Sequence, residues 1–361
     1  MKIVRSGIFH YSVPFIAPMR LTGRNMKERE GYIVRLYGDS GKPAHGEIAP
    51  LPGLHYESPE EAARQARQVL GTLTGHPFPH TFSPLDGSFT LPSGLYPSVR
   101  TGLEMALLNL FAVESLASLP DLPGCRGHAT IPLNGLVTGT VGEIEEQAAR
   151  LVEEGYQTLK LKVGRIELRQ EIAMVRFVRS IIGPDIALRL DANRSWSLQD
   201  AVEFGRAVTG LDIEYIEEPL ADPGAHAEFV RKTGIRIALD ESLAAGRVLP
   251  EPDPATVRAF VLKPSVAGGI ARTLELIRLA QHSAIGAVLS SAFETGVSLG
   301  MYAWLASIAN NDDVACGLDT YKFLQHDILV TPFGAERGRV DSEKAWEQSQ
   351  VVRSECIREV V

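Results

Sequence analysis

The chain has 361 residues, of which 45% are hydrophobic and 22% charged, and its 36 basic and 44 acidic side chains give a net charge of −8. This composition is that of a globular protein with a sizeable core, and it excludes disordered, collagen-like and coiled-coil chains. Nucleic acid is not an expected partner, because the chain has no run of basic residues with which to displace phosphate counterions.

The three cysteines, Cys125, Cys316 and Cys356, are widely spaced and form no C-x-x-C pair. An odd number at such spacings is typical of a reducing compartment. The sequence starts with no long apolar segment of the signal-peptide kind, and no apolar run reaches the roughly 20 residues of a membrane span. We therefore expect a cytoplasmic protein without a membrane partner.

Strand-like segments dominate the first part of the chain. Residues 33–37 and 44–48 predict two strands joined by a hairpin turn. The sequence Ser58–Glu61 is a capping box with proline at the first helical position, which predicts a helix, and a second helix is expected over residues 98–118. These elements predict a small α+β domain over residues 1–125.

Residues 126–330 have a different pattern, in which short apolar strands alternate with amphipathic helices. This alternation is typical of a parallel sheet with crossover helices. Eight strand–helix units favour a closed barrel, with an open doubly wound sheet as the alternative. Residues 331–361 are expected to pack back on the first domain or the barrel. The expected strands are 131–137, 158–163, 186–193, 213–217, 236–240, 259–263, 287–291 and 314–319.

Charged residues lie near the carboxyl ends of five of these strands, although a strand of a buried parallel sheet should be almost entirely apolar. Side chains alternate faces along a strand, so Lys160 and Lys162 share one face. In a barrel that face can be the interior, and barrel enzymes carry their catalytic groups at the carboxyl-terminal rim. One such charge is usually solvated, but a series in phase with consecutive strands predicts an active site. The series is Lys160, Lys162, Asp191, Glu217, Asp240 and Lys263.

The residue types in this series indicate its chemistry. Three carboxylates without nearby His or Cys favour Mg²⁺ or Mn²⁺ over zinc. A lysine acts as a base only when burial and a neighbouring cation lower its pKa from about 10.4 towards about 7–8, and Lys160 could supply that cation to Lys162. The arrangement suits removal of a proton α to a carboxylate, so we expect a small-molecule carboxylate substrate.

The chain resembles the enolase superfamily, in its muconate-lactonizing branch. The motifs are Lys160-x-Lys162, Asp191-x-Asn193, Glu217-Glu218-Pro219, Asp240-Glu241-Ser242 and Lys263-Pro264. Shorter strings are most similar to the o-succinylbenzoate synthase family; they are residues 17–22, 46–53, 188–194 and 289–291 with Glu294-Thr295. The resemblance implies a (β/α)7β-type modified TIM barrel with an N-terminal α+β capping domain. It also implies Mg²⁺-dependent syn dehydration of 2-succinyl-6-hydroxy-2,4-cyclohexadiene-1-carboxylate to o-succinylbenzoate in menaquinone biosynthesis.

The resemblance also assigns roles to individual residues. In Glu-Glu-Pro the family ligand is the first acid, so Glu217 is chosen over Glu218 to ligate Mg²⁺ with Asp191 and Asp240. Lys162 would be the base that takes the α-proton and returns it to the departing hydroxide. Lys263 would stabilise the enediolate from the opposite face, and Lys160 would tune Lys162. Loops at about 15–28 and 50–56 would exclude water and select the substrate. Substrate-binding or orienting roles fall to Arg189, Asn193, Ser290, Ser291, Glu294, Met19 and Arg20.

Two alternatives remain open at this point. N-acylamino acid racemases and dipeptide epimerases of the same superfamily would use both Lys162 and Lys263 as acid and base. Dipeptide epimerases typically carry Asp-x-Asp where this chain has Gly317-Leu318-Asp319, and racemase-competent relatives often carry Arg at the position of Val266. Both departures favour the synthase.

A remoter alternative is a serine hydrolase. Residues 296–300 fit G-x-S-x-G, with Ser298 as nucleophile and Asp319 and His326 following in hydrolase order. A milder interpretation of the same helix start is that its backbone N–H groups bind a substrate carboxylate.

Overall fold

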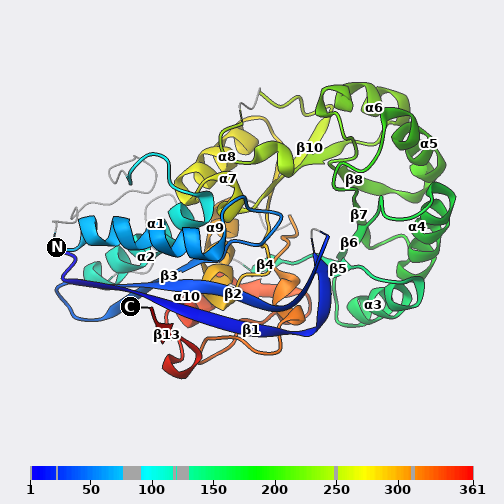
Figure 1. The fold of residues 1–361 in the computed structure, drawn as a ribbon. Coiled ribbons are helices and arrows are strands. Elements are labelled where there is room, and N and C mark those ends of the chain that lie inside the picture. Colours follow the sequence, from blue (N-terminus) through cyan, green and yellow to red (C-terminus); the bar gives the residue numbers. More distant parts are fainter. Residues whose placement is uncertain are drawn as a thin grey trace.

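The computed structural model describes residues 2–21, 23–75, 91–116, 119, 130–247, 251–309 and 314–360, without the side chains of Arg20, Leu21 and Arg24. A strand-rich domain lies against an α/β barrel (Figure 1), which is the expected fold class. Cys125 lies outside the described residues, while Cys316 and Cys356 are free thiols.

The capping domain is an antiparallel sheet covered by two helices. Its strands have the order β13-β1-β2-β3. In α1, Ser58 Oγ accepts a hydrogen bond from the Glu61 N–H at 3.2 Å and Glu61 Oε2 accepts one from the Ser58 N–H at 2.8 Å, so the predicted capping box is confirmed. The elements are β1 (Arg5–Leu21), β2 (Arg24–Tyr37), β3 (Pro43–Ile48), α1 (Pro59–Leu73), α2 (Pro97–Ser115) and β13 (Arg358–Glu359).

The barrel contains a seven-stranded parallel sheet in the order β11-β10-β9-β8-β7-β6-β5, with helices on its outer face (Figure 1). The strands are β5 (Gly135–Val137), β6 (Thr158–Lys162), β7 (Ala187–Asp191), β8 (Ile213–Glu217), β9 (Ile237–Leu239), β10 (Val257–Leu262) and β11 (Gly286–Leu289). The helices are α3 (Val141–Glu153), α4 (Leu168–Ile182), α5 (Leu198–Val208), α6 (His226–Thr233), α7 (Pro264–Ala267), α8 (Ile270–His282) and α9 (Gly296–Ala309).

The segment expected to form the last strand is not a regular strand. It makes only isolated parallel bridges, Leu133↔Cys316 on one side and Ser290↔Gly317 on the other. The backbone hydrogen bonds from Cys316 N to Pro132 O (2.8 Å) and from Gly317 N to Leu289 O (2.7 Å) nevertheless connect the two sides of the barrel. Glycine at the second bridge leaves room for the Ser290 side chain, because a Cβ on Gly317 would lie 2.6 Å from Ser290 Oγ and would force it to move.

The expected first strand is also divided. Its first half, β4 (Thr130–Pro132), pairs with β12 (Arg339–Asp341) and not with the barrel sheet, which begins at β5. The C-terminal segment also includes α10 (Ser342–Ser349), which packs on α9, and Trp346 Nε1 donates a hydrogen bond to Asn109 Oδ1 on α2 at 3.0 Å. The segment therefore contacts both the barrel and the capping domain.

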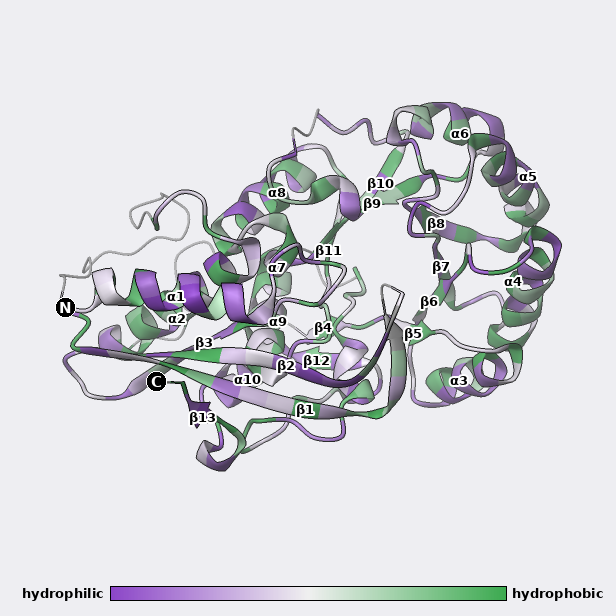
Figure 2. Cartoon of the chain, in the orientation of Figure 1, coloured by the Kyte–Doolittle hydropathy of each residue, from purple (hydrophilic) through white to green (hydrophobic). Residues whose placement is uncertain are grey.

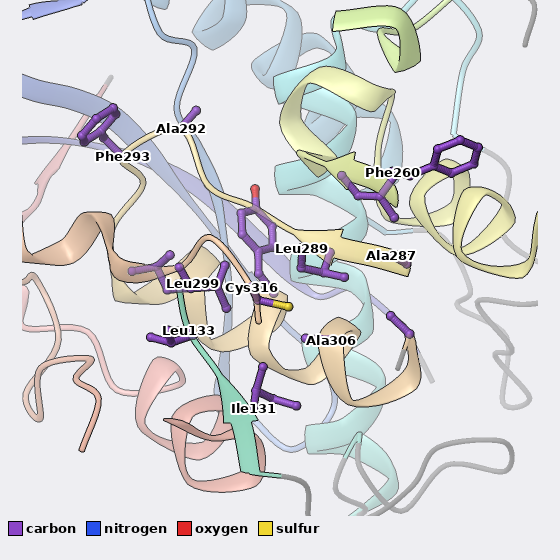
Figure 3. Close-up of a cluster of buried hydrophobic side chains, with 14 of the residues drawn as sticks. Ile131, Leu133, Phe260, Ala287, Leu289, Ala292, Phe293, Leu299, Ala306 and Cys316 are labelled. Carbon is purple, nitrogen blue, oxygen red and sulfur yellow. The ribbon is translucent and has the colours of Figure 1, made fainter. Parts of the chain in front are cut away.

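A hydrophobic core extends through the barrel wall. Residues 314–319, which connect the two sides of the barrel, are called the closing segment below. Leu133, Leu289, Leu299 and Cys316 belong to one buried cluster around this segment and α9 (Figure 3). Hydrophilic residues interrupt the hydrophobic colouring of β6, β7 and β8 (Figure 2), and the charged residues at the carboxyl ends of these strands are among them. Of the helices in the described ranges, none has both the length and the apolar character that crossing a membrane requires.

Candidate active site

The charged strand ends lie at one level of the barrel. Lys162 is the Cα partner of Asp191 in the β6–β7 pair, and Asp191 is the partner of Glu217 in the β7–β8 pair. Asp240 directly follows β9 and Lys263 directly follows β10. Because parallel strands in register present their carboxyl ends at one edge, these side chains meet at one rim.

Ion pairs link the lysines to the carboxylates. Lys160 Nζ lies 2.9 Å from Asp191 Oδ2 and 2.7 Å from Glu217 Oε2. Lys162 Nζ lies 2.6 Å from the same Asp191 oxygen. Lys263 Nζ contacts Asp240 Oδ2. Asp191 and Glu217 are fully buried and Asp240 is nearly so, which places the carboxylates of the cluster below the protein surface.

Burial and neighbouring charges give the two lysines of β6 different properties. Burial, aided by the Lys160 ammonium, lowers the pKa of Lys162, although Asp191 opposes this shift. Burial acts on Lys160 too, but the carboxylates of Asp191 and Glu217 outweigh it and raise the pKa of that lysine. Burial and the Asp191 carboxylate raise the pKa of Glu217 to about 8. The electrostatics thus distinguish Lys162 as the lysine whose ammonium form is disfavoured.

The donor chemistry of the cluster fits a hard divalent cation. Asp191, Glu217 and Asp240 offer buried carboxylate oxygens from adjacent strand ends, the ligands that Mg²⁺ takes in proteins. In the described part of the chain no three His, Cys, Asp or Glu side chains converge as a metal cluster, because the carboxylates are turned towards lysine ammonium groups. Lys160 nevertheless lies between Asp191 and Glu217, so a cation is accommodated at this position.

Glu218 has a different environment from its neighbour Glu217. Its Oε1 accepts hydrogen bonds from the backbone N–H groups of Asp240 (3.1 Å) and Ser242 (2.6 Å). Its Oε2 accepts one from Arg194 Nε at 2.9 Å. Both carboxylate oxygens are therefore used to connect β7, β8 and β9, whereas those of Glu217 face the lysines.

Asn193 lies beside the predicted base. Its Oδ1 accepts a hydrogen bond from Lys162 Nζ at 2.7 Å, and its Nδ2 donates one to Glu241 Oε1 at 3.0 Å. The backbone N–H of Asn193 donates to Asp191 Oδ1 at 3.1 Å. Asn193 can thus orient the Lys162 ammonium, while Glu241 is a contact that the strand-end pattern did not single out.

Arg189 lies outside this cluster. Its Nε donates to Glu214 Oε2 at 2.7 Å and its Nη1 to the Ala315 carbonyl at 2.6 Å. The guanidinium also packs 5.1 Å from the centre of the Tyr215 ring. These contacts join β7, β8 and the closing segment, so Arg189 stabilises the barrel wall in this structure.

The other predicted substrate residues are dispersed around the barrel mouth. Ser290 lies at the Gly317 bridge, and Ser291 Oγ lies 2.6 Å from Thr320 Oγ1. Glu294 is buried and accepts a hydrogen bond from Ser265 Oγ at 2.8 Å. The predicted loop at 15–28 is mostly a β1–β2 hairpin, in which Met19 is half-buried against the core; the Arg20 side chain lies outside the described residues.

The interpretation of Ser298 as a hydrolase nucleophile is not supported. Its side chain is buried on α9 and its Oγ has no hydrogen-bond partner, whereas His326 is exposed. The milder interpretation is wrong as well, because the Ser298 N–H donates to Glu47 Oε2 at 3.0 Å and the Gly296 N–H to Asp327 Oδ1 at 3.1 Å. Protein carboxylates already use the start of this helix.

The resemblance indicated the loop at about 50–56, which contains His55, but it did not single out His55 or Thr101 as capping residues that touch the barrel beside Lys263. Thr101 Oγ1 donates to the Pro264 carbonyl at 2.9 Å. His55 Nε2 lies 3.0 Å from the Ser265 carbonyl, and its Nδ1 accepts the Leu51 N–H at 2.9 Å. Burial lowers the pKa of His55 to about 4, so this imidazole is neutral near pH 7. No local pattern could have found these contacts with the barrel, because each of them spans more than 160 positions.

Both domains match known families. Residues 143–345 match the family model described as enolase C-terminal domain-like, and residues 3–110 match that of the MenC N-terminal domain. An o-succinylbenzoate synthase of Haemophilus influenzae is 33% identical over 327 residues, covering 89% of this chain and 91% of the relative. Protein PHYLLO of Arabidopsis thaliana is also 33% identical, over 86% of this chain, but the match spans only 20% of that longer protein.

A solved structure shares the fold. A dipeptide epimerase from Enterococcus faecalis, complexed with Mg and the dipeptide L-Leu-L-Tyr, superposes with a TM-score of 0.82 at 21% identity. The match covers 99% of this chain and 100% of the epimerase chain. The likeness at this identity concerns the architecture of barrel and capping domain.

Proposed function

We propose, since this chain belongs to the enolase superfamily, that it is an o-succinylbenzoate synthase of menaquinone biosynthesis. Its reaction would be the Mg²⁺-dependent syn dehydration of 2-succinyl-6-hydroxy-2,4-cyclohexadiene-1-carboxylate to o-succinylbenzoate. The observation that carries the proposal is the cluster at the barrel rim, in which Lys162 and Lys263 contact Asp191 and Asp240 from different strands. The synthases among the relatives, similar over most of the chain, support the choice of reaction.

The proton transfer is assigned to Lys162. Its neutral amine takes the α-proton of the substrate, and the ammonium that forms then protonates the hydroxide as the C–O bond breaks, so that water leaves. One base serves both steps because the eliminated groups depart from the same face. Asn193 holds the Lys162 nitrogen at 2.7 Å, which fixes its direction during both transfers.

Lys263 and Lys160 stabilise negative charge. Lys263 follows β10, four strands from the β6 that bears Lys162, so it approaches the substrate from the opposite side of the barrel mouth. Its ammonium stabilises the enediolate as charge develops on the carboxylate oxygens. The positive charge of Lys160 repels that of the Lys162 ammonium, which lowers the pKa of Lys162 and favours its neutral amine.

Asp191, Glu217 and Asp240 would hold the Mg²⁺, or Mn²⁺ in its place. When bound, the ion would supply positive charge beside the substrate carboxylate, which stabilises the additional negative charge that develops there as the α-proton leaves. The ion would replace the ammonium groups of Lys160, Lys162 and Lys263 as the counter-charge of these carboxylates, so that the lysines would be free to face the substrate.

The rival activities are racemisation of N-acylamino acids and epimerisation of dipeptides by the same lysines. The environment of Asp319 is an argument against the epimerisation of dipeptides. Its Oδ1 accepts a hydrogen bond from the Tyr156 hydroxyl at 2.5 Å and lies 3.5 Å from Lys322 Nζ, so this carboxylate is already satisfied by the protein. An ammonium group of a dipeptide would have to displace Lys322.

The test is a panel of substrates with the purified protein in Mg²⁺. We expect o-succinylbenzoate to form from the cyclohexadiene substrate, and no product after Mg²⁺ is removed with EDTA. N-succinyl amino acids and dipeptides are assayed in parallel for loss of optical activity. Robust racemisation or epimerisation without dehydration would overturn the proposed synthase.

A further inference from the structure

One loop at the barrel mouth is held from the capping domain. This loop, residues 290–295, connects β11 to α9 and carries Ser290, Ser291 and Glu294. Glu47 on β3 accepts a hydrogen bond at Oε1 from the N–H of Thr295, at the end of this loop, and one at Oε2 from the N–H of Ser298, in the first turn of α9, both at 3.0 Å. The Tyr11 hydroxyl donates a third bond to Oε1 at 2.5 Å. Every partner is a donor, as an ionised carboxylate requires.

Glu47 also occupies the positive end of α9. A carboxylate at a helix N-terminus is stabilised by the unpaired N–H groups and the helix dipole. The next N–H, that of Leu299, bonds to the Thr295 carbonyl at 3.1 Å. The loop therefore cannot shift without breaking the contact between Glu47 and the first turn of α9.

Arg29 makes a second attachment to the same loop. It is fully buried, and its Nε donates to the Phe293 carbonyl at 3.2 Å while Nη1 donates to the Pro50 carbonyl at 3.1 Å. Phe293 has a φ of 62°, a left-handed conformation that a bulky residue adopts only where its surroundings enforce it. The backbone of the loop is thus strained at Phe293, and the hydrogen bond from Arg29 of the capping domain keeps it in this conformation.

Two glycines let the strand that carries Glu47 pack closely enough for its carboxylate to reach Thr295 and Ser298. A Cβ on Gly46 would lie 2.0 Å from the Gly102 carbonyl oxygen, and one on Gly102 would lie 2.7 Å from the Glu47 carbonyl oxygen. Only glycine at both positions lets β3 lie directly on α2. The close approach of these two elements fixes the depth at which Glu47 meets the barrel.

We propose that Glu47 is a positioning residue that fixes the 290–295 loop from the capping domain, so that Ser290 and Ser291 face the substrate in one arrangement. The inference rests on the proposed function in taking these serines as substrate contacts. Glu47 itself touches neither the lysines nor the predicted metal ligands. Its loss should therefore weaken substrate binding and leave proton transfer by Lys162 nearly intact.

The test compares Glu47→Gln with a matched control, Glu57→Gln. Glu57 is also a buried carboxylate of the capping domain and accepts a hydroxyl hydrogen bond, from Ser98 at 2.5 Å. For Glu47→Gln we expect KM for the cyclohexadiene substrate to rise about tenfold while kcat changes less than about threefold, the signature of lost uniform binding. Amide hydrogen exchange of residues 295–299 should become faster. The control should change neither quantity, whatever its effect on thermal stability.

The outcomes separate this inference from the proposed function. A wild-type protein without dehydration activity would overturn the synthase, but the exchange measurement would still test the attachment. Unchanged KM in folded Glu47→Gln, or an equal rise in Glu57→Gln, would overturn the positioning role. If Glu47→Gln does not fold, Tyr11→Phe replaces it, because that variant removes only one of the three hydrogen bonds. A smaller rise in KM is then expected, and no rise would contradict the inference.

Discussion

Loss of the negative charge should affect stability at Glu218 and activity at its neighbour Glu217. Glu218 is fully buried, and its carboxylate accepts two backbone N–H groups and the Arg194 guanidinium. Glu217 is equally buried, but it lies among Asp191, Asp240 and the lysines. We predict that Glu218→Gln lowers stability and that Glu217→Gln mainly abolishes activity.

The magnitude for Glu218 comes from its partners. Removing one member of a buried ion pair costs about 3–5 kcal/mol, because the other charge is left buried without a partner. The Arg194 side chain is 19% exposed, so water partly replaces the lost carboxylate and we expect the lower end, about 3 kcal/mol. For Glu217→Gln we expect a change within about 1 kcal/mol, because the loss of attraction to Lys160 is offset by relief of repulsion from two neighbouring carboxylates.

The assay is urea unfolding in EDTA, which removes any contribution of bound metal to stability. Dehydration activity of both variants is then titrated with Mg²⁺. Glu217→Gln should show little or no activity at any Mg²⁺ concentration, and Glu218→Gln should retain the wild-type Mg²⁺ requirement in its folded fraction. Equal loss of stability in the two variants would refute the distinction between a structural and a functional acid.

Two further predictions concern the interface and the barrel closure. Burial lowers the pKa of His45 and of His55 to about 4, so between pH 6.5 and 4 the unfolded chain binds protons that the folded chain does not. Each of these histidines should therefore contribute a loss of stability of about 2 kcal/mol as the pH falls from 6.5 to 5, while the raised pKa of Glu217 contributes in the opposite direction. Urea unfolding at pH 7 and 5 checks this, and an unchanged pH dependence in His55→Asn would contradict it. Gly317→Ala should lower the free energy of unfolding by about 1–3 kcal/mol through its clash with Ser290 Oγ, and Ser290→Ala should recover part of the loss. An additive double variant would exclude that clash as the cause.

The sequence was informative where a residue type conflicts with its environment. Lys160, Asp191 and Glu217 are polar side chains in strands that are otherwise apolar, and this conflict predicted the rim cluster. The preference for Glu217 over Glu218 came from the family motif, and its physical reason is seen only in the structure, where Arg194 and two backbone N–H groups already occupy the Glu218 carboxylate. The metal-ligand and lysine roles themselves stay predictions.

The parts that could not be predicted depend on distant contacts. Residues 314–319 have strand-like composition, but in the structure they form only the isolated bridges to Leu133 and Ser290. Arg29 occurs in ordinary strand sequence and Glu47 in the string 46–53 that carries the resemblance, but neither stretch indicates their partners in the barrel, which lie about 250 positions away in the chain. A pattern limited to one element carries no signal for such contacts.

The most direct test of the central claim is the fate of the substrate α-proton in deuterated water. Lys162→Ala is compared with wild type and with Lys232→Ala, which removes a half-exposed lysine on α6 far from the rim. We predict that Lys162→Ala forms no o-succinylbenzoate and exchanges no α-proton, while Lys232→Ala behaves as wild type. Exchange that persists in Lys162→Ala would contradict the account, because another residue would then be the base.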